Sequence, residues 1–415
     1  MYQRMPNDTV TFEQYLDERL MGERDGYYTR HVRFGSVETG GDFCTYPTLL
    51  SPYFGAAIAE HAYRMWQGMV RAGSLGAREA FTVIEHGAGE GHLARDFLER
   101  SQRYPWFHRL VRYDIYERSR RLRGMQTEAA RPFKRQVRIH AVDIGHAPRR
   151  RIKGLILEND VLSATAVHKV LIRRNGDHQV TLVRKTPDGV EEAFENITRH
   201  PRVARYLQAI EPALSEAFAG SARDEGFLYV NPRAEAYYRW AADSLQAGYV
   251  LSIDNFTDTR VLAHRALAFG RDINNQRIPW PQFKAIRAGR VTAIPYEMPG
   301  PFDVAIAQDV SYLAQVAEQR GLRRLAYAHQ GCLFAGVALA PYDCRLLAKH
   351  WIRDGHPPEW AEVTAGETLR RFLLDGGYST PVGGFSLLLM QKAGTDDAYR
   401  FPEQAEPAVT NGQHL

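Results

Sequence analysis

A glycine-rich turn between an apolar run and a helix-like segment holds the residues with the clearest chemical potential. The turn reads Glu85-His86-Gly87-Ala88-Gly89-Glu90-Gly91; it follows the β-prone run Phe81 to Ile84 and precedes the helix-like segment His92 to Arg100. A strand, a glycine turn and a helix in this order bring backbone N–H groups close to a nucleotide-type cofactor. Side chains would block that approach, so the glycines leave it open. The turn therefore predicts a cofactor site.

The spacing of the glycines distinguishes one cofactor from another. The dinucleotide pattern places its third glycine three positions after its second, where this chain has His92. The third glycine falls instead at Gly91, which gives the form Glu-x-Gly-x-Gly-x-Gly. This form is typical of S-adenosylmethionine (SAM) methyltransferases. We therefore expect Gly87, Gly89 and Gly91 to approach SAM, and a nicotinamide oxidoreductase is the disfavoured alternative.

Three carboxylates at the ends of successive predicted strands could hold the remaining parts of SAM. Glu85 can accept from the cofactor ammonium group, directly or through water. Glu117, which lies 26 residues after Gly91, can bind the ribose diol, as an acidic residue after the second strand does in related folds. Asp143, in a run that ends at Ile144, can accept from the adenine amino group. Each of Glu117 and Asp143 could instead cap a helix or remain solvated.

The acceptor side of the site falls on a segment that follows the fourth predicted strand. Glu158 and Asp160 flank Asn159 at a strand end, where ligands of open α/β sheets bind. Strand alternation points both carboxylates to the same side if the strand continues. That arrangement would suit a cationic nitrogen, although either residue could instead cap a helix or pair with an arginine. His168 could be a base for an oxygen acceptor, but a lone histidine at a strand start is more often structural.

The pattern of elements places these residues on an α/β fold. The predicted strands are near-continuous apolar runs separated by helical segments, which favours a parallel sheet covered on both faces. They are Thr82–Glu85, Tyr113–Glu117, Val137–Val142, Gly154–Leu157, Tyr249–Ile253, 323–328 and Phe385–Gln391. The expected fold class, given the glycine motif, is that of a class I methyltransferase, a Rossmann-like and mostly parallel sheet with an antiparallel and helical insertion.

The insertion is marked by hairpin turn signals. Asn175-Gly176 and Pro187-Asp188-Gly189 separate the short runs Val170–Ile172, Val180–Val183 and Val190–Phe194. Helical segments are expected near 201–218, 233–246 and 309–320, and residues 255–305 read as irregular. The expected organisation is a cap over the cofactor at 1–80, a SAM-binding core at 81–167 and 248–392, an insertion at 168–247 and a flexible tail at 393–415.

Composition excludes several other classes of protein. The formal net charge of +5 over 415 residues is small, so no nucleic-acid partner is expected. The longest apolar run is too short for a membrane span, which takes about 20 residues, and the N-terminus lacks a signal core. The three cysteines Cys44, Cys332 and Cys344 lie far apart without paired zinc spacing. We therefore expect reduced thiols, a cytoplasmic location and no metal site.

Several segments taken in order resemble the MidA-like SAM-dependent methyltransferases, a family that includes a mitochondrial complex I assembly factor that methylates a protein arginine. The matching segments, besides the glycine loop, include Thr11-Phe12-Glu13-Gln14-Tyr15-Leu16, Gly41-Asp42-Phe43-Cys44-Thr45, Ser51-Pro52-Tyr53-Phe54-Gly55, Tyr116-Glu117-Arg118-Ser119 with Gln126, and Pro299-Gly300 with Asp303. The resemblance spans roughly residues 10–392. It implies the candidate cofactor-binding set Thr45, Glu85, Gly87, Gly89, Gly91, Glu117, Asp143, Ile144 and Asn159, and the candidate catalytic set Glu158, Asp160 and His168.

The acceptor side departs from the family pattern. Where the family has Asn-Glu-x-x-Asp-Ala-x-Pro-Val-His, the glutamate is Asp160, the aspartate is Ser163 and the proline is Ala166. Later in the chain Asp303 and Asp309 match a second family motif, but its threonine and histidine are replaced by alanines. The resemblance thus implies that cofactor binding is kept while the acceptor differs.

Three hypotheses for function follow. The first is a SAM-dependent methyltransferase that acts on a nitrogen, with an arginine guanidinium of a protein or of free arginine as acceptor. The second is a small-molecule N- or O-methyltransferase of a biosynthetic pathway. The third is a SAM-binding assembly factor without turnover. The sequence leaves the oligomeric state open, with a homodimer as one alternative.

Overall fold

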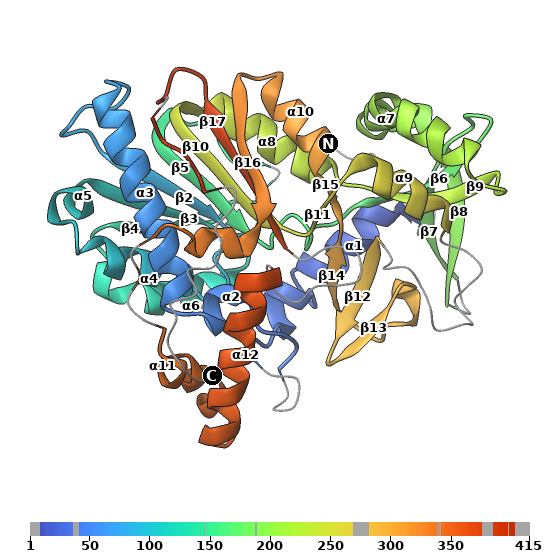
Figure 1. Ribbon diagram of the computed structural model, residues 1–415. Helices are drawn as coiled ribbons and strands as arrows, with labels where there is room; N and C mark the ends of the chain where they lie inside the picture. Colours follow the sequence, from blue (N-terminus) through green and yellow to red (C-terminus); the bar gives the residue numbers. More distant parts are fainter. Residues whose placement is uncertain are drawn as a thin grey trace. The chain divides into compact units, whose positions relative to one another are not determined.

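The two largest sheets within the described residues are a mostly parallel one and a smaller, antiparallel one (Figure 1). The computed structural model describes residues 9–35, 41–144, 146–186, 189–268, 282–337, 339, 342–375, 385–396 and 398–402. Contacts divide the chain into two compact units. Unit 1 contains residues 1–32, 160–238 and 255–316, and unit 2 contains residues 33–159, 239–254 and 317–415.

The main sheet of unit 2 has, within the described residues, seven strands in the order β16-β17-β10-β5-β2-β3-β4. Their bounds are β2 Phe81–His86, β3 Val111–Tyr116, β4 Val137–His140, β5 Ile152–Asn159, β10 Leu245–Asp254, β16 Leu322–His329 and β17 Ser386–Lys392. Only β17 runs antiparallel to its neighbours β10 and β16 among these pairings. The mostly parallel sheet predicted from the sequence is confirmed.

Both faces of this sheet are buried, as the continuous apolar runs predicted. Phe81 and Val83 on one face and Ile84 and His86 on the other are at most 1% exposed. The first face contributes to a core with α3 (Tyr53–Arg71), α4 (His92–Ser101) and α5 (Pro105–Leu110). On the other face His86 packs against Trp240 near the end of α8 (Pro232–Ser244). A polar face exposed to water would have required alternating residues instead.

Unit 1 is built around the predicted antiparallel insertion. Strands β6 (His168–Arg173), β7 (Gln179–Thr186) and β8 (Gly189–Asn196) form successive antiparallel pairs, with β9 (Glu225–Val230) beside β6 and β1 (Thr9–Thr11) beside β7. The predicted helix at 201–218 is α7 (Pro201–Ala219). The predicted runs 170–172, 180–183 and 190–194 thus lie in antiparallel strands, and the structure adds β1 and β9 beside them. Pro187 and Asp188 of the second turn signal lie outside the described residues.

Residues 255–305, which read as irregular in the sequence, contain regular elements in the structure. They include α9 (Thr259–Ala268) and a three-stranded antiparallel sheet of β12 (Phe283–Arg287), β13 (Arg290–Thr292) and β14 (Asp303–Ile306). The strands are only three to five residues long. Such short runs carry too few positions for an alternating pattern to show. Two-residue strands β11 (Phe256–Thr257) and β15 (Gln308–Asp309) pair in parallel nearby, and α10 (Val310–Glu318) follows.

The first helix of the chain, α1 (Phe12–Met21), begins with the cap that the sequence predicted. Thr11 Oγ1 accepts from the backbone N–H of Gln14, and the Gln14 side chain accepts from the backbone N–H of Thr11. This capping box satisfies donors that the helix itself leaves unpaired. Phe12 and Leu16 of α1 are fully buried in the apolar core of unit 1.

The two compact units differ from the expected domains in their boundaries. The expected core at 248–392 contributes residues 255–316 to unit 1, because β12, β13 and β14 pair with one another and not with the main sheet. The expected tail is packed where it begins: Thr395 and Asp396 are at most 5% exposed, and Tyr399 packs against Tyr249. Residues 403–415 of that tail lie outside the described residues.

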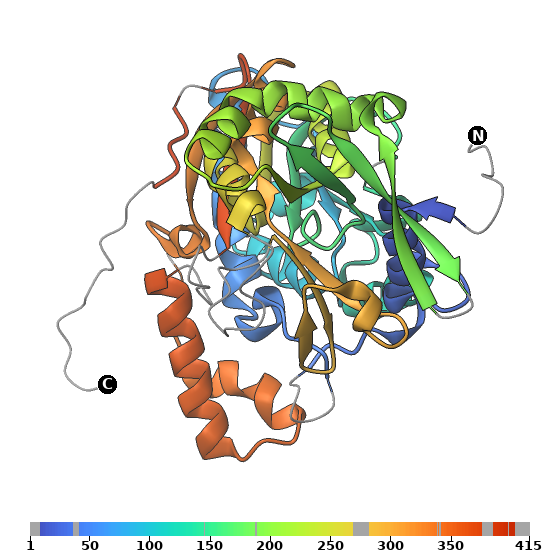
Figure 2. The same cartoon turned by 90° about the vertical axis from the view of Figure 1, so that its right-hand side faces the viewer.

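The last part of unit 2 contains two helices that the sequence pattern did not predict. They are α11 (Cys344–Arg353) and α12 (Pro358–Asp375), which pack against each other (orange to red in Figures 1 and 2). Asp343 caps α11 by accepting from the backbone of Arg345. Among the described helices, none is long and apolar enough to cross a membrane.

Candidate functional site

The glycine loop lies at the point where the order of the main sheet reverses. Strand β2 ends at His86, with β3 on one side and β5 on the other. Gly87, Gly89 and Gly91 all have positive φ, at 64°, 52° and 85°. The loop is fastened by Gly87 N–H, which donates to Tyr116 O, and by Gly91 N–H, which donates to Ala88 O. This is the switch-point position at which open α/β sheets bind ligands.

Glu85 is a buried carboxylate at the end of β2. It is 2% exposed, and Tyr113 Oη on β3 donates to its Oε2 at 2.8 Å. Burial raises the pKa of Glu85 to about 8, and the nearby charge of Glu117 also raises it, while the Tyr113 hydrogen bond lowers it. Burial makes the charged form of this carboxyl unfavourable, and a bound cation would stabilise that charged form. This fits the expected contact with an ammonium group.

Glu117 directly follows β3 and is held by donors from the start of α6 (Arg120–Ala129) and from its middle. The backbone N–H of Ser119 donates to Glu117 Oε1 at 2.7 Å, and Gln126 Nε2 donates to Oε2 at 3.2 Å. Gln126 Nε2 also donates to Gly89 O at 3.0 Å. Burial raises the pKa of Glu117 to about 7 in spite of these bonds. Gln126 therefore joins the carboxylate to the glycine loop, a role that only the family motif indicated in the sequence.

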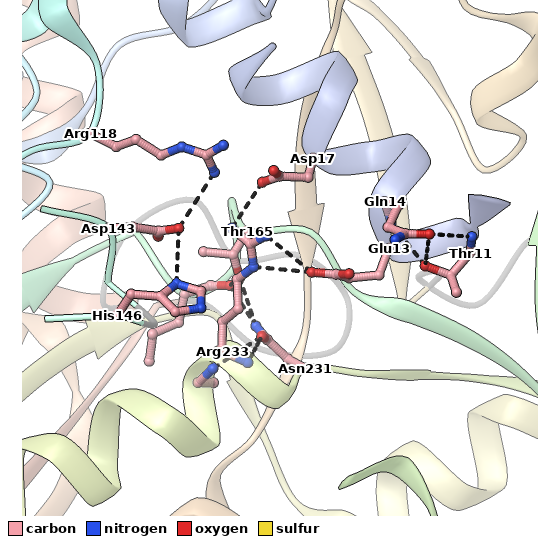
Figure 3. Close-up of polar contacts among 12 residues, drawn as sticks. Thr11, Glu13, Gln14, Asp17, Arg118, Asp143, His146, Thr165, Asn231 and Arg233 are labelled. Atoms are coloured by element: carbon pink, nitrogen blue, oxygen red, sulfur yellow. Dashed lines mark hydrogen bonds and ion pairs between the residues drawn. The ribbon is translucent and has the colours of Figure 1, made fainter. Parts of the chain in front are cut away.

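Asp143 and Ile144 lie just beyond β4. Figure 3 shows the Asp143 carboxylate between Arg118 Nη1, at 3.5 Å, and His146 Nδ1, at 3.4 Å. The Asp143 side chain is 22% exposed, so water or a ligand can reach it, and Ile144 is buried. Both residues thus follow the end of the third strand of the chain's α/β pattern, where the sequence predicted the adenine contact. Their role in binding stays a prediction.

Thr45 and Asn159, the two other candidate cofactor-binding residues, both lie in unit 2. Thr45 precedes α2 (Tyr46–Leu49), and its Oγ1 lies 3.2 Å from Thr48 Oγ1. Thr48 in turn donates to Glu90 Oε2 of the glycine loop at 3.5 Å. Asn159 ends β5 and is in register with Ile253 of β10. Thr45 is thus linked through Thr48 to the glycine loop, and Asn159 lies at the carboxyl edge of the sheet.

The expected pairing of Glu158 with Asp160 on one side of an extended strand is wrong. Strand β5 ends at Asn159, and Asp160 has φ 58°, in the left-handed region that residues other than glycine adopt rarely. Glu158 is fully buried, in register with His86 and Ser252. Because the strand does not continue, alternation does not apply to Asp160. Backbone conformations of this kind gather at functional sites, which makes Asp160 the stronger candidate.

Asp160 belongs to a polar cluster in unit 1 that also contains Tyr28 and Asp303. The sequence pattern pointed to the two carboxylates but did not join them to Tyr28. Ser163 Oγ donates to Asp160 Oδ1 at 2.8 Å, and Tyr28 Oη donates to Asp303 Oδ1 at 2.6 Å. Burial raises the pKa of Tyr28 well above its ordinary value, and the charges of Asp303 and Asp160 raise it further. Tyr28 stacks edge-on against Tyr27. The family motif pointed to Asp303, but its partner Tyr28 lies 275 residues away.

Asp309, the other acidic residue retained from that motif, accepts hydrogen bonds from several elements of unit 1. It accepts from Thr259 Oγ1 at 2.6 Å, from Tyr206 Oη at 2.9 Å and from the backbone N–H of Tyr312 at 3.0 Å. The last bond caps α10, which begins at the next residue. Asp309 therefore serves to hold α7, α9 and α10 together.

His168 lies at the start of β6, and its ring packs against that of His200 with centroids 5.6 Å apart. Burial lowers the pKa of His168 to about 3, and the charges of His200 and Arg233 lower it further. A base this weak is poorly matched to proton removal near neutral pH. The structural alternative for His168 is therefore favoured.

The segment after Asp160 is fixed from two directions within unit 1. Asn231 Nδ2 donates to Leu162 O and to Thr165 Oγ1, both at 2.9 Å, and Ile306 N–H donates to Ser163 O. Figure 3 shows Asn231 beside Arg233, which bonds Glu13 and Asp17 of α1. Asn231 and β14 thus hold the segment that carries Asp160 and Ser163.

Comparison with known proteins decides the family. The family described as "Putative S-adenosyl-L-methionine-dependent methyltransferase" matches residues 57–328, more than half of the chain. The chain belongs to this family. The resemblance to the MidA-like methyltransferases is thereby confirmed, and SAM is the cofactor. A search of the curated proteins found no match.

Solved structures support the fold of this methyltransferase. A COG1565 superfamily member from Burkholderia thailandensis, bound to S-adenosyl-homocysteine, is similar with a TM-score of 0.67 at 21% identity, over 96% of this chain and 91% of that one. A second structure of a COG1565 superfamily protein from the same organism has a TM-score of 0.65 at 19% identity, with the same coverage. The class I methyltransferase fold predicted from the sequence is confirmed.

The residues present fit SAM as a ligand. Three glycines with positive φ leave the loop backbone open beside two buried carboxylates, Glu85 and Glu117, at successive strand ends. The ammonium group and the ribose diol of SAM are hydrogen-bond donors, and both carboxylates are acceptors when ionised. Glu85 and Glu117 are therefore the residues we expect to hold these two groups.

Proposed function

We propose that this methyltransferase transfers the methyl group of SAM to a nitrogen of a cationic acceptor, with an arginine guanidinium as the leading candidate. The observation that carries the proposal is the cluster of Tyr28, Asp160 and Asp303 in unit 1. Two carboxylates and a phenol provide acceptors for the planar N–H donors of a guanidinium. The cluster replaces the Glu158 and Asp160 pair on which the sequence-based hypothesis rested.

Each group in the cluster has a distinct part in this proposal. When bound, SAM supplies the methyl group, and the chain must align the acceptor nitrogen and remove its proton. Asp303 keeps a fixed orientation because Tyr28 Oη donates to its Oδ1 at 2.6 Å. Asp160 follows β5 directly and accepts from Ser163 with one oxygen, Oδ1. Asp303 is thus the orienting carboxylate and Asp160 the candidate proton acceptor.

The second candidate function is SAM binding without turnover, in an assembly factor. It is favoured by Ser163, which stands where the family has an aspartate and donates to Asp160 at 2.8 Å. That bond occupies one oxygen of Asp160, the acidic residue that this segment keeps from the family motif. A small-molecule nitrogen or oxygen acceptor is the third alternative, and the same experiment addresses it.

The test is a methyl-transfer assay with labelled SAM and three acceptor classes: arginine-containing peptides, small amines and small hydroxyl compounds. We expect label on nitrogen, with arginine peptides preferred. Asp160→Asn and Asp303→Asn should each lower kcat by about 10²- to 10³-fold, because proton transfer and orientation are lost. Asp177→Asn, at a turn residue with a half-exposed side chain, is the matched control and should leave kcat unchanged.

The outcomes separate the three functions. Label found only on oxygen would overturn the nitrogen proposal. If no acceptor class is methylated while S-adenosyl-homocysteine binds normally, the proposal fails and binding without turnover is favoured. Equal activity of Asp160→Asn and the control would remove Asp160 from the mechanism.

A further inference from the structure

Cys44, His350 and Asp354 of unit 2 converge on one point. One ligand atom from each residue lies within 4.8 Å of the others. Cys44 Sγ is 3.3 Å from His350 Nε2, and Asp354 Oδ2 is 3.4 Å from the same nitrogen. Ligand atoms bound tetrahedrally to zinc, at about 2.0–2.3 Å, lie roughly 3.3–3.8 Å from one another. The two measured separations match that spacing.

We propose that Cys44, His350 and Asp354 form a zinc site. A thiolate, an imidazole and a carboxylate are the protein ligands that Zn²⁺ takes, and three of them leave a fourth position for water. The softness of the thiolate disfavours Mg²⁺ and Ca²⁺, which prefer oxygen ligands. Cysteine spacing in the sequence predicted no metal site, because the cysteine is separated from the other two ligands by some 300 residues and only the fold brings them together.

The backbone holds these ligands in place from two elements. His350 lies in the last turn of α11 and Asp354 follows its end, four residues later, so both lie on one face of the helix. Their side chains are 6% and 12% exposed. Cys44 precedes α2 in a segment tied down by Gly35 N–H, which donates to Phe43 O. The three ligands therefore come from two parts of the chain, α11 with the residue that follows it and the segment before α2.

The hydrogen bonds of His350 show which ring nitrogen carries the proton, and metal binding would have to move that proton. Arg353 Nη2 lies 3.1 Å from His350 Nδ1, and a guanidinium can only donate, so Nδ1 is the acceptor and Nε2 carries the ring proton. Zinc at Nε2 requires the proton on Nδ1 instead. The Arg353 side chain is 54% exposed and can turn into solvent. Arg353 thus competes with the metal, and its removal should strengthen binding.

A reactive cysteine is the competing interpretation of the same cluster. Burial raises the pKa of Cys44 to about 12, and the charges of Asp354 and Glu90 raise it further. A nucleophilic cysteine requires a lowered pKa. The negative surroundings disfavour a free thiolate but attract a divalent cation, which displaces the thiol proton on binding.

The proposed zinc would fasten α11 beside the cofactor loop. Cys44 is adjacent to Thr45, whose neighbour Thr48 donates to Glu90 Oε2. Glu90 lies between Gly89 and Gly91. Zinc is therefore expected to stabilise the cofactor side of unit 2 without entering the reaction.

The test uses the full chain, stripped of metal with a chelator and titrated with zinc chloride by calorimetry. We expect one zinc per chain. Cys44→Ser and His350→Gln should weaken zinc binding on the order of 100-fold or more, and Arg353→Ala should tighten it. Cys344→Ser, which removes a cysteine from the same helix without touching the cluster, is the matched control. Cobalt(II) in place of zinc should give a thiolate charge-transfer band in wild type and in Cys344→Ser, and not in Cys44→Ser.

Folding of each variant is checked by far-ultraviolet circular dichroism and by S-adenosyl-homocysteine binding. The proposal is overturned if the wild type binds zinc no more tightly than a folded Cys44→Ser variant. It is also overturned if cobalt binds without the thiolate band, because the metal would then lie elsewhere. Weaker zinc binding by Arg353→Ala would contradict the assignment of Nε2 as the ligand atom.

Discussion

At the scale of single residues, two buried carboxylates are the groups that we expect to hold the cofactor. Glu85 and Glu117 are at most 5% exposed, and burial raises the pKa of each, to about 8 and about 7. Such groups destabilise the folded protein when they are charged, and a ligand that donates hydrogen bonds to them stabilises the charged form. Glu117 also receives donors from Ser119 and Gln126, which fix its orientation before any ligand arrives.

Glu117→Gln should weaken S-adenosyl-homocysteine binding by about 10- to 100-fold, because charge-assisted bonds to the ribose diol become neutral ones. Isothermal titration calorimetry measures the change. Glu99→Gln, at an exposed position of α4, is the control and should bind as the wild type does. Wild-type affinity of Glu117→Gln would mean that Glu117 does not bind the cofactor.

At the scale of elements, the glycine loop packs closely against α6 where it leads into α4. Gly91 precedes α4 with φ 85°, and a Cβ atom there would lie 3.1 Å from Ala129 Cβ and 3.2 Å from Gln126 Cα. Both neighbours belong to α6. The third glycine is therefore required by conformation and by helix packing together, in addition to cofactor access.

Gly91→Ala should lower the free energy of unfolding by about 2–4 kcal/mol, from left-handed strain plus overpacking against α6. Gly73→Ala provides the comparison, because Gly73 has φ 72° and a Cβ atom there would meet nothing within 4 Å. That variant should lose only about 1 kcal/mol. Urea denaturation measures both, and equal losses would show that packing against α6 contributes nothing.

At the scale of the whole molecule, the raised carboxyl pKa values couple global stability to pH. The folded state holds protons on Glu85 and Glu117 at pH values where the unfolded chain has released them. Their contribution to stability is complete below about pH 4.5 and is lost as pH rises through the folded pKa values. Each group costs up to about 1.4 kcal/mol per pH unit within that window.

The free energy of unfolding of Glu85→Gln should therefore fall less steeply than that of the wild type between about pH 5 and pH 8. A glutamine does not titrate, so the drop that Glu85 causes disappears. Urea denaturation of the cofactor-free protein at half-unit pH steps gives both curves. Parallel curves would show that Glu85 has an ordinary pKa in the folded protein.

Local sequence was sufficient to predict the main sheet, the antiparallel hairpins and the glycine turn after β2. Phe81–Ile84 is a strand because its apolar run is buried on both faces, and the turn between β6 and β7 includes Gly176 because glycine accepts its positive φ of 79°. Both effects act between near neighbours in the chain. The short strands β12 to β14 escaped prediction because runs of three to five residues carry too few positions for an alternating pattern to show.

The sequence by itself determined the cofactor and the family, since glycine spacing and strand-end carboxylates are local signals. Only the tertiary structure decided how the polar side chains group. It ended β5 at Asn159 and separated Glu158 from Asp160, it joined Tyr28 to Asp303, and it brought Cys44 to His350. The last two pairings span some 300 residues, and no local preference of the backbone encodes contacts at such separations.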